Sequence, residues 1–279
     1  MRTTVLSFFI VLLAAPLQAD DWHKTYTIPG KGTVHVATND GNIQVSTWDG
    51  KQIEVSVETV GWKIADNEVR IIENQIGNRL DLEARVPNIN WNIVNNRRSL
   101  RIILKIPHDA DLNVRTGDGN VETDGNMGAT DIRTGDGRIT INRSSGNIRL
   151  STGDGNINAT GLDGQLDAST GDGTIRVEGR FDSLNLKTSD GTIDALVSRE
   201  SRLLTGWNVR TGDGTVTLRL PENLQADLDV HTGDGSIRAD IPVIVSGKID
   251  RSELRGKLNG GGPALTVRSG DGSINIVKN

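Results

Sequence analysis

The sequence predicts an all-β fold: a single-stranded parallel β-helix, or solenoid, with coils of about 18 residues in its regular part. A four-residue motif, Thr/Ser-Gly/Ser-Asp-Gly, recurs along the chain, and its first five copies begin 18 residues apart, followed by steps of 23, 21 and 37 residues. Apolar and polar residues alternate between the copies, as in half-buried strands, and no unit has helical spacing. The tetrads are Thr116–Gly119, Thr134–Gly137, Thr152–Gly155, Thr170–Gly173, Thr188–Gly191, Thr211–Gly214, Thr232–Gly235 and Ser269–Gly272, with a ninth relative at Thr38–Gly41.

Residues 1–19 are predicted to be a secretory signal peptide. Arg2 precedes an apolar run from Val5 to Ala15, and Ala19 ends a sequence suited to cleavage. The run is too short to span a bilayer, so we expect no transmembrane segment after its removal. The chain has no cysteine, which excludes disulfides and thiolate metal sites. We therefore expect an exported protein, periplasmic or extracellular.

Residues 20–110 are less regular, and we expect them to open the solenoid and cap its first coil. A terminal repeat has to differ from the interior, because an open sheet edge invites aggregation. An Asn-rich loop, Pro87–Arg98, carries Trp91. The strand-like runs of this part are Thr33–Val36, Asn42–Thr47, Gln52–Thr59, Glu68–Ile72, Arg79–Arg85 and Leu100–Ile106.

Residues 111–279 are predicted to be the regular β-helix, in which each unit has two short strands and two tight turns. An antiparallel meander is the alternative, because Asp-Gly between alternating runs is also a hairpin signal, and it would place Leu150 opposite Ile157. A meander leaves one apolar face without a cover. Coiling instead buries Ile148, Leu150, Ile157, Leu166, Ile175, Val177, Leu184, Leu186 and Ile193 against one another.

The tetrads are interpreted as the corner of each coil. We expect their glycines to adopt positive φ, their aspartates to bond to the local backbone, and their threonine hydroxyls to satisfy buried backbone groups. The fourth-position glycines assigned to these turns are Gly119, Gly137, Gly155, Gly173, Gly191, Gly214, Gly235 and Gly272.

Stacked coils would bring the tetrad aspartates together, and these like charges need something to offset them. One possibility is a calcium cofactor, as in a calcium-stabilised solenoid. The other is a basic residue directly before each of six tetrads, at Arg115, Arg133, Lys187, Arg210, His231 and Arg268. With this second explanation no metal is expected. With the first explanation, the candidate metal ligands are Asp118, Asp136, Asp154, Asp172 and Asp190.

The polar positions after each tetrad predict a flat strip that could bind an extended polymer or a partner surface. The same strip is equally the solvated face that every solenoid has. The candidate binding residues are Asn120, Arg138, Asn156, Thr174, Arg176, Thr192, Thr215 and Arg238.

Composition and motifs argue against catalysis and against nucleic acid as a partner. The four histidines, His23, His35, His108 and His231, have no metal-ligand spacing, and no Gly-x-Ser-x-Gly elbow or HExxH pair occurs. We predict no catalytic residues. The net charge of −5 lacks the basic excess that phosphate binding needs.

Several motifs occur in a distinctive order. They are Trp48-Asp49-Gly50 before a strand, Leu104-Lys105-Ile106-Pro107 before Leu112-Asn113-Val114, the tetrads, and Leu258 to Gly262 before Ser269 to Ile276. In this order the chain resembles the bacterial putative-adhesin family of β-strand-repeat domains, a domain of unknown function. The resemblance implies a right-handed parallel β-helix. It implies no activity, since fold alone does not give function.

The sequence thus favours an exported, non-catalytic, adhesin-like β-helical protein of the cell envelope. Its expected partner is an envelope component, a protein or a surface polymer. The alternatives are a structural or stress-related envelope scaffold, as a rod about 60 Å long, and the calcium-stabilised solenoid.

Overall fold

The computed structural model describes residues 19–87, 98–245 and 250–279, which form twenty-three strands and no helix. The all-β prediction is confirmed. Residues 1–18 of the predicted signal peptide and all but the ends of the Pro87–Arg98 loop, Trp91 included, lie outside the described residues. Within the described ranges, no helix is long and apolar enough to cross a membrane.

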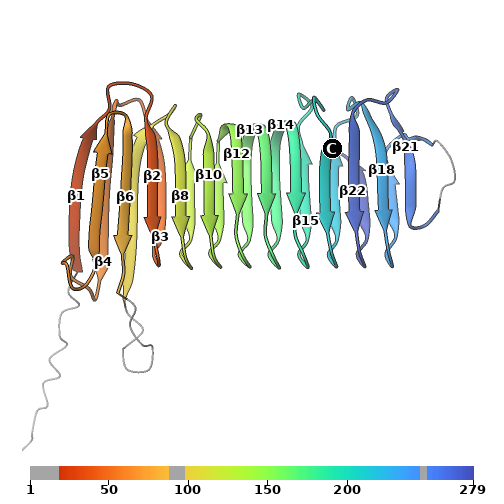
Figure 1. Cartoon of the computed structure of the whole chain (residues 1–279). Helices are drawn as coiled ribbons and strands as arrows, with labels where there is room; N and C mark the ends of the chain where they lie inside the picture. The colour runs from red at the N-terminus through yellow and green to blue at the C-terminus, as the bar shows by residue number, and fades with distance from the viewer. Residues whose placement is uncertain (1–18, 88–97, 246–249) are drawn as a thin grey trace, which may run out of the picture.

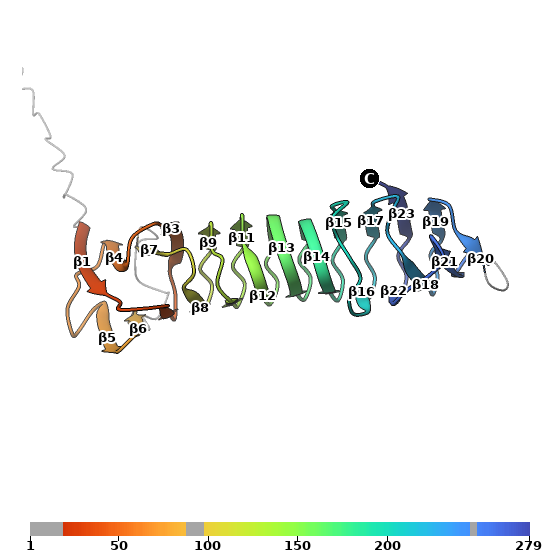
Figure 2. The same cartoon turned by 90° about the horizontal axis from the view of Figure 1, so that it is seen from above.

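The strands form two layers that run side by side along one long axis (Figures 1 and 2). In spatial order, layer A contains β1 (Ala19–Thr27), β4 (Gln52–Val60), β7 (Ser99–Pro107), β3 (Asn42–Trp48), β9 (Val121–Asp124), β11 (Ile139–Asn142), the first parts of β13 (Ile157–Ser169) and β14 (Ile175–Lys187), β15 (Ile193–Val197), β17 (Val216–Leu220), β23 (Ile274–Lys278) and β19 (Ile237–Asp240). Layer B contains β5 (Arg70–Ile76), β6 (Arg79–Arg85), β2 (Thr33–Thr38), β8 (Asp111–Thr116), β10 (Thr130–Thr134), β12 (Ser145–Ser151), the second parts of β13 and β14, β16 (Trp207–Thr211), β22 (Ala264–Ser269), β18 (Ala226–Thr232), β21 (Glu253–Leu258) and β20 (Ile244–Val245).

Five of the six strand-like runs in the irregular part are confirmed as strands with nearly the expected bounds. The sixth, Glu68–Ile72, begins later, as β5 at Arg70, because a turn closed by the Glu68 N–H to the Ala65 carbonyl (3.1 Å) precedes it. The alternation of apolar and polar residues did not predict the strand β1. That strand is a polar sheet edge and buries only Tyr26, so it lacks an apolar face.

The regular strands pair in parallel, with partners 18 residues apart. Leu150 pairs with Ile132 on one side and Ala168 on the other, not with Ile157 as a meander requires. Antiparallel pairs occur at the ends, where β1, β4 and β7 meet and where β21 lies beside β18. The sheets are therefore mixed, and the meander is wrong for the repeats.

The core lies between the two layers and is made of stacked aliphatic side chains. Val121, Ile139, Ile157 and Ile175 occupy one register row of layer A, and all are buried. The nine residues predicted to be buried have exposed fractions of 3% or less, so that prediction is confirmed.

The tetrads form one corner between the layers, where their hydroxyls connect successive coils. Thr152 Oγ1 lies 3.0 Å from the carbonyl oxygens of both Gly135 and Gly137, and it accepts the Gly155 N–H at 3.2 Å. Thr134 and Thr170 make the same two carbonyl contacts one coil away on either side. The expected role of the threonine hydroxyls is confirmed.

The expectation that the tetrad glycines adopt positive φ is wrong. Among the described residues, those with positive φ include Gly41 but none of the eight fourth-position glycines from Gly119 to Gly272. Glycine is needed there because the coils approach closely. A Cβ on Gly155 would lie 2.0 Å from the Gly137 carbonyl oxygen, and the other seven positions give 1.7 to 2.1 Å.

Spatial order departs from chain order at both ends of the stack. The early strand β2 lies between β6 and β8, and β3 lies between β7 and β9. At the other end, β22 lies between β16 and β18, and β23 lies between β17 and β19. The first and last coils are thus inserted into the stack rather than placed on its ends.

Candidate binding surface

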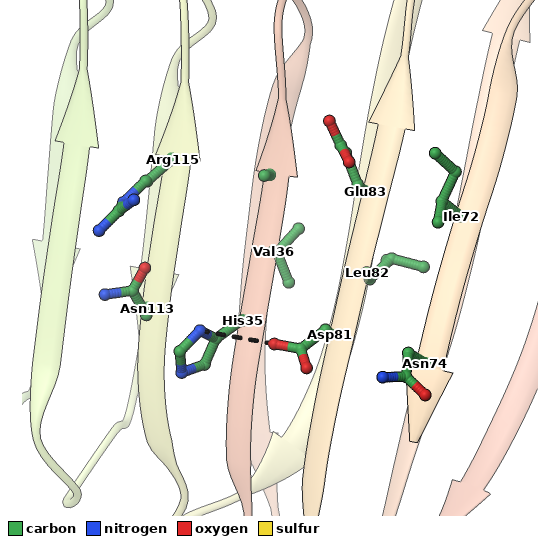
Figure 3. A pocket seen from close by; sticks show the side chains of 10 residues that line it. His35, Val36, Ile72, Asn74, Asp81, Leu82, Glu83, Asn113 and Arg115 are labelled. Atoms are coloured by element: carbon green, nitrogen blue, oxygen red, sulfur yellow. Dashed lines mark ion pairs between the residues drawn. The ribbon is translucent and has the colours of Figure 1, made fainter. Parts of the chain in front are cut away.

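Two shallow hollows lie side by side on the outer surface of layer B, across β5, β6, β2, β8, β10 and β12. Each encloses about 280 Å³. Both are lined by His35 and Asn113, so they form one continuous depression, the layer B groove. Figure 3 shows the first hollow, in which the side chains stand on neighbouring strands.

One register row of outward side chains crosses the groove. It runs through Asn74 on β5, Asp81 on β6, His35 on β2, Asn113 on β8 and Asp131 on β10. The dashed line in Figure 3 joins His35 Nδ1 to Asp81 Oδ1, 3.6 Å apart. Adjacent strands are about 4.8 Å apart, so the row presents a closely spaced series of donors and acceptors.

The first hollow exists because the next row has a small residue in the middle. Ala37 lies between Glu83 on β6 and Arg115 on β8. Its methyl group leaves open the space above β2. Glu83 is held by Arg85, with Nε 2.7 Å from Oε1, whereas the ion pairs of the described residues do not include Arg115. Arg115 therefore offers a guanidinium to a ligand in the hollow.

Fixed ion pairs form part of the second hollow. Asp111 Oδ1 is 2.7 Å from Lys31 Nζ and accepts the Ala129 N–H at 2.9 Å. Burial by itself raises the pKa of Asp111, but these two hydrogen bonds outweigh it and hold that pKa below its usual value. Asp131 is paired with Arg133 at 3.0 Å. Both carboxylates of this hollow are thus paired with a basic side chain and held in place.

The fold and groove geometry can be compared with known proteins. A family model described as Toastrack DUF4097 matches residues 32–277. The chain belongs to the Toastrack DUF4097 family. This confirms the family resemblance seen in the sequence motifs.

Solved structures with similar folds are only distantly related to this Toastrack chain. A putative lipid binding protein from Parabacteroides distasonis is 16% identical, with a TM-score of 0.50 over 93% of this chain and 97% of that one. A putative adhesin from Parabacteroides merdae is 13% identical, with a TM-score of 0.45 over 93% and 97%. A putative cell adhesion protein from Clostridium sporogenes is 15% identical, with a TM-score of 0.34 over 94% and 100%. No curated protein matches the chain.

The binding residues predicted from the sequence lie on the other layer of this Toastrack fold. Two of them have a structural contact: Asn120 Oδ1 accepts the Arg138 N–H at 2.9 Å, and Asn156 Oδ1 accepts the Thr174 N–H at 2.8 Å. These amides connect one coil to the next. The side chains of Arg138, Arg176, Thr192 and Arg238 are exposed on layer A, and Thr215 is half-buried there.

The tetrad aspartates Asp118, Asp136, Asp154, Asp172 and Asp190 are exposed at the corner. Their expected neutralisation by the preceding basic residue is wrong. Arg133 pairs with Asp131, and Arg268 pairs with Asp229. Residues two apart in a strand share a face, whereas the tetrad aspartate lies beyond a buried threonine, around the corner.

The tetrad turns at Thr134 and Thr152 are closed by the threonine hydroxyl, which accepts the N–H of the fourth-position glycine. Local bonding by an aspartate occurs at the related turn Thr38–Gly41, where Asp40 accepts a backbone hydrogen bond from Gly41. Repulsion between aspartates acts at one end of the corner, where burial, and then the charge of Asp118, raise the pKa of Asp40. In the part of the chain that the structure describes, no group of three or more His, Asp or Glu side chains could hold a metal ion. Calcium at the corner stays an untested alternative.

The sequence analysis did not identify the groove residues His35, Asn74, Asp81, Asn113 and Asp131. Alternation alone points them outward from their strands. Their neighbours could not be inferred, because β2 pairs with strands far along the chain. Thr33 of β2 pairs with Arg79 of β6, 46 residues later, and with Asp111 of β8, 78 residues later. The one available signal was Ala37, which stands where the next two units have Arg115 and Arg133.

Proposed function

We propose that the protein is an exported, non-catalytic, adhesin-like binding protein of the cell envelope, and that it holds its partner in the layer B groove. The observation that carries the proposal is the pair of adjoining hollows that share His35 and Asn113. Extended ligands suit a groove that crosses several strands of a rigid double layer. Residues 1–19 would direct the chain to the periplasm or the cell exterior.

The chemistry of the groove favours a polar partner. Its lining combines the amides of Asn74 and Asn113, the His35 imidazole and the Arg115 guanidinium with carboxylates that are already paired. These groups exchange hydrogen bonds with hydroxyl, amide and carboxylate groups. A glycan or an extended peptide of the envelope fits that set, whereas duplex nucleic acid needs a broad basic surface.

The same lining supports a non-catalytic role. His35 Nδ1 lies 3.6 Å from Asp81 Oδ1, too far for the hydrogen bond that orients a catalytic base, and Asp81 Oδ2 instead accepts a hydrogen bond from Arg79 Nε at 2.9 Å. This arrangement suits hydrogen bonding to a partner rather than proton transfer.

We also propose that the stack is a single-stranded, right-handed parallel β-helix with coils of about 18 residues. The support is the register of β8, β10, β12 and β13, whose paired residues differ by 18 in number. An exposed strip along layer A would then repeat with the same period.

Filling the first hollow tests the proposed function. In Ala37→Arg, the side chain occupies the space above β2, as arginine does at the equivalent positions of β8 and β10. With residues 20–279, we expect the native protein to bind isolated peptidoglycan or outer-membrane glycan in a sedimentation assay. We expect Ala37→Arg to lose that binding.

Thr217→Arg, on the outer face of layer A, is the matched control and should bind as the native chain does. Equal binding by native protein and Ala37→Arg, or no retention by any envelope fraction, contradicts the proposal.

A structural envelope scaffold is the second candidate function. The observation that favours it is the continuous series of Thr-to-carbonyl bonds, which locks each coil to its neighbour. A scaffold needs rigidity and no ligand. The scaffold is therefore the function that remains if no envelope fraction retains the native chain.

A further inference from the structure

A row of cations crosses layer B at the end away from the groove. Lys187 on β14 pairs in register with Arg210 on β16, Arg210 with Arg268 on β22, and Arg268 with His231 on β18. Lys187, Arg210 and His231 are exposed, and Arg268 is half-buried. Because the row crosses four adjacent strands, it is about 14 Å long.

The fold does not require cations at these positions. In the same register row, β12 and β13 carry Ser151 and Ser169, whose hydroxyls lie 3.2 Å apart. Like charges directly opposite one another on neighbouring strands are destabilising. Within the described ranges, Arg268 forms an ion pair, with Asp229, while the ion pairs found there include neither Lys187 nor Arg210.

The inserted coil creates the row. In chain order, the strand after β16 and β17 is β18, which would set Arg210 beside His231. Because β22 lies between them, Arg268 adds a fourth basic side chain to the centre.

A short series of hydrogen bonds holds Arg210 in position. Asn185 Nδ2 donates to Asp167 Oδ1 at 3.0 Å, Asn208 Nδ2 donates to Asn185 Oδ1 at 3.2 Å, and Arg210 Nε donates to Asn208 Oδ1 at 2.8 Å. The terminal guanidinium nitrogens of Arg210 form no hydrogen bond with the described residues. A guanidinium group held in this way can bind a carboxylate through two parallel hydrogen bonds.

We propose that this cation row, Lys187, Arg210, Arg268 and His231, is a binding site for a linear acidic polysaccharide that lies across the four strands. The site is separate from the layer B groove and does not depend on it. Carboxylates along a sugar chain meet successive cations, and the neighbouring Asn185 and Asn208 amides stand beside the sugar hydroxyls.

Flanking acids favour a single chain over a flat anionic surface. Asp167 and Asp229 lie in the adjacent row, and exposed aspartates lie at the corner on the other side, at Asp190, Asp213, Asp271 and Asp234. A membrane of anionic lipid or a nucleic-acid duplex would contact these carboxylates as well as the cations. A narrow polymer can follow the positive line between them.

Polygalacturonate, a linear polymer with a carboxylate on each sugar, is the probe. We expect residues 20–279 to bind it saturably at low ionic strength in isothermal titration calorimetry, and added NaCl to weaken the binding. Lys187→Gln with Arg210→Gln should weaken it by at least about tenfold, since hydrogen bonds to charged groups contribute that much or more. Neutral dextran should not bind.

Arg101→Gln with Lys105→Gln is the matched control: it removes the same charge from exposed positions of β7 on layer A. It should bind as the native chain does, as should Ala37→Arg, which alters only the groove. Melting temperatures verify that each variant is folded. Absence of polygalacturonate binding at low salt overturns the proposal, as does equal loss in both double variants. Binding of phosphatidylglycerol vesicles through Lys187 and Arg210 without polymer binding also overturns it.

Discussion

Ser269 Oγ donates a hydrogen bond to the Gly214 carbonyl oxygen at 3.0 Å, although 55 residues separate the two. The tetrad between them in the chain does not take that place: Thr232 Oγ1 instead donates to Gly272 at 2.6 Å. The last tetrad therefore lies between two earlier ones. The C-terminal coil of β22 and β23 is an interior layer of the stack, with a neighbour on each side.

Removal of residues 264–279 should therefore disrupt the C-terminal part of the stack. The deletion takes away the partner of β16 and of β18 at once and exposes the edges of buried rows, such as those at Val209 and Val230, which both pair with Val267. We expect amide hydrogen exchange to show loss of protection in β16 to β19. Deletion of β1, an edge strand paired with β4 alone among the described strands, is the control and should leave those amides protected. Retained protection after the C-terminal deletion would contradict the insertion.

Gly155→Ala tests the close approach of the coils. The added methyl carbon would lie 2.0 Å from the Gly137 carbonyl oxygen, and a backbone atom cannot move aside as a side chain can. We expect the free energy of unfolding to fall by about 2 kcal/mol or more, as for overpacking in a tight core. Urea denaturation measures it. Asp154→Ala, one residue away and exposed, should change it little; a similar loss in both variants would point to the turn sequence instead.

Thr152→Val tests the hydroxyl contacts at the corner. The change keeps the side chain's shape but leaves the buried Gly155 N–H without its Thr152 Oγ1 acceptor at 3.2 Å. A buried polar group without a partner costs about 1–3 kcal/mol, so we expect a loss of that size in urea denaturation. Thr152→Ser keeps the hydroxyl, as Ser269 does naturally, and should lose distinctly less. Equal effects of valine and serine would mean that packing of the methyl group, not the hydroxyl, matters.

Much of this fold follows from local patterns in the sequence. Alternation identifies inward residues such as Ile157 and Leu166, and the tetrad spacing gives the parallel register, because both depend on neighbouring residues alone. The role of the tetrad threonines follows for the same reason. The arginines before the tetrads were misassigned because the face of the strand, rather than sequence distance, decides which carboxylate they reach.

The inserted coils could not be predicted, and the binding surfaces depend on them. The tetrads are nearly identical, so the one at Ser269 fits against Gly214 as well as the one at Thr232 does, and sequence alone cannot rank these pairings. Both His35 in the groove and Arg268 in the cation row owe their neighbours to an insertion. These sites therefore depend on contacts between coils distant in the chain.

Calcium should leave the stability of the protein unchanged. A ligand that binds the native state alone raises its melting temperature. The exposed tetrad aspartates do not form a group of three ligating side chains within the described residues. We expect equal melting temperatures in a chelator and in millimolar calcium. A rise with calcium that is lost in Asp136→Asn with Asp154→Asn would support a cation column at the corner.

Asp40→Asn should stabilise the protein at neutral pH. Burial and the charge of Asp118 raise the pKa of Asp40 in the folded state, so the folded protein holds this proton more tightly than the unfolded chain does. The stability linked to that proton is complete below the ordinary carboxyl pKa of 3.8 and is lost as the pH rises through the raised value. Asparagine cannot ionise and avoids that loss. We therefore expect a higher melting temperature than the native chain at pH 7 and a smaller difference at pH 3. Asp154→Asn, at an exposed position of the same corner, controls for removal of one negative charge; an equal gain there would assign the effect to net charge rather than to the burial of Asp40.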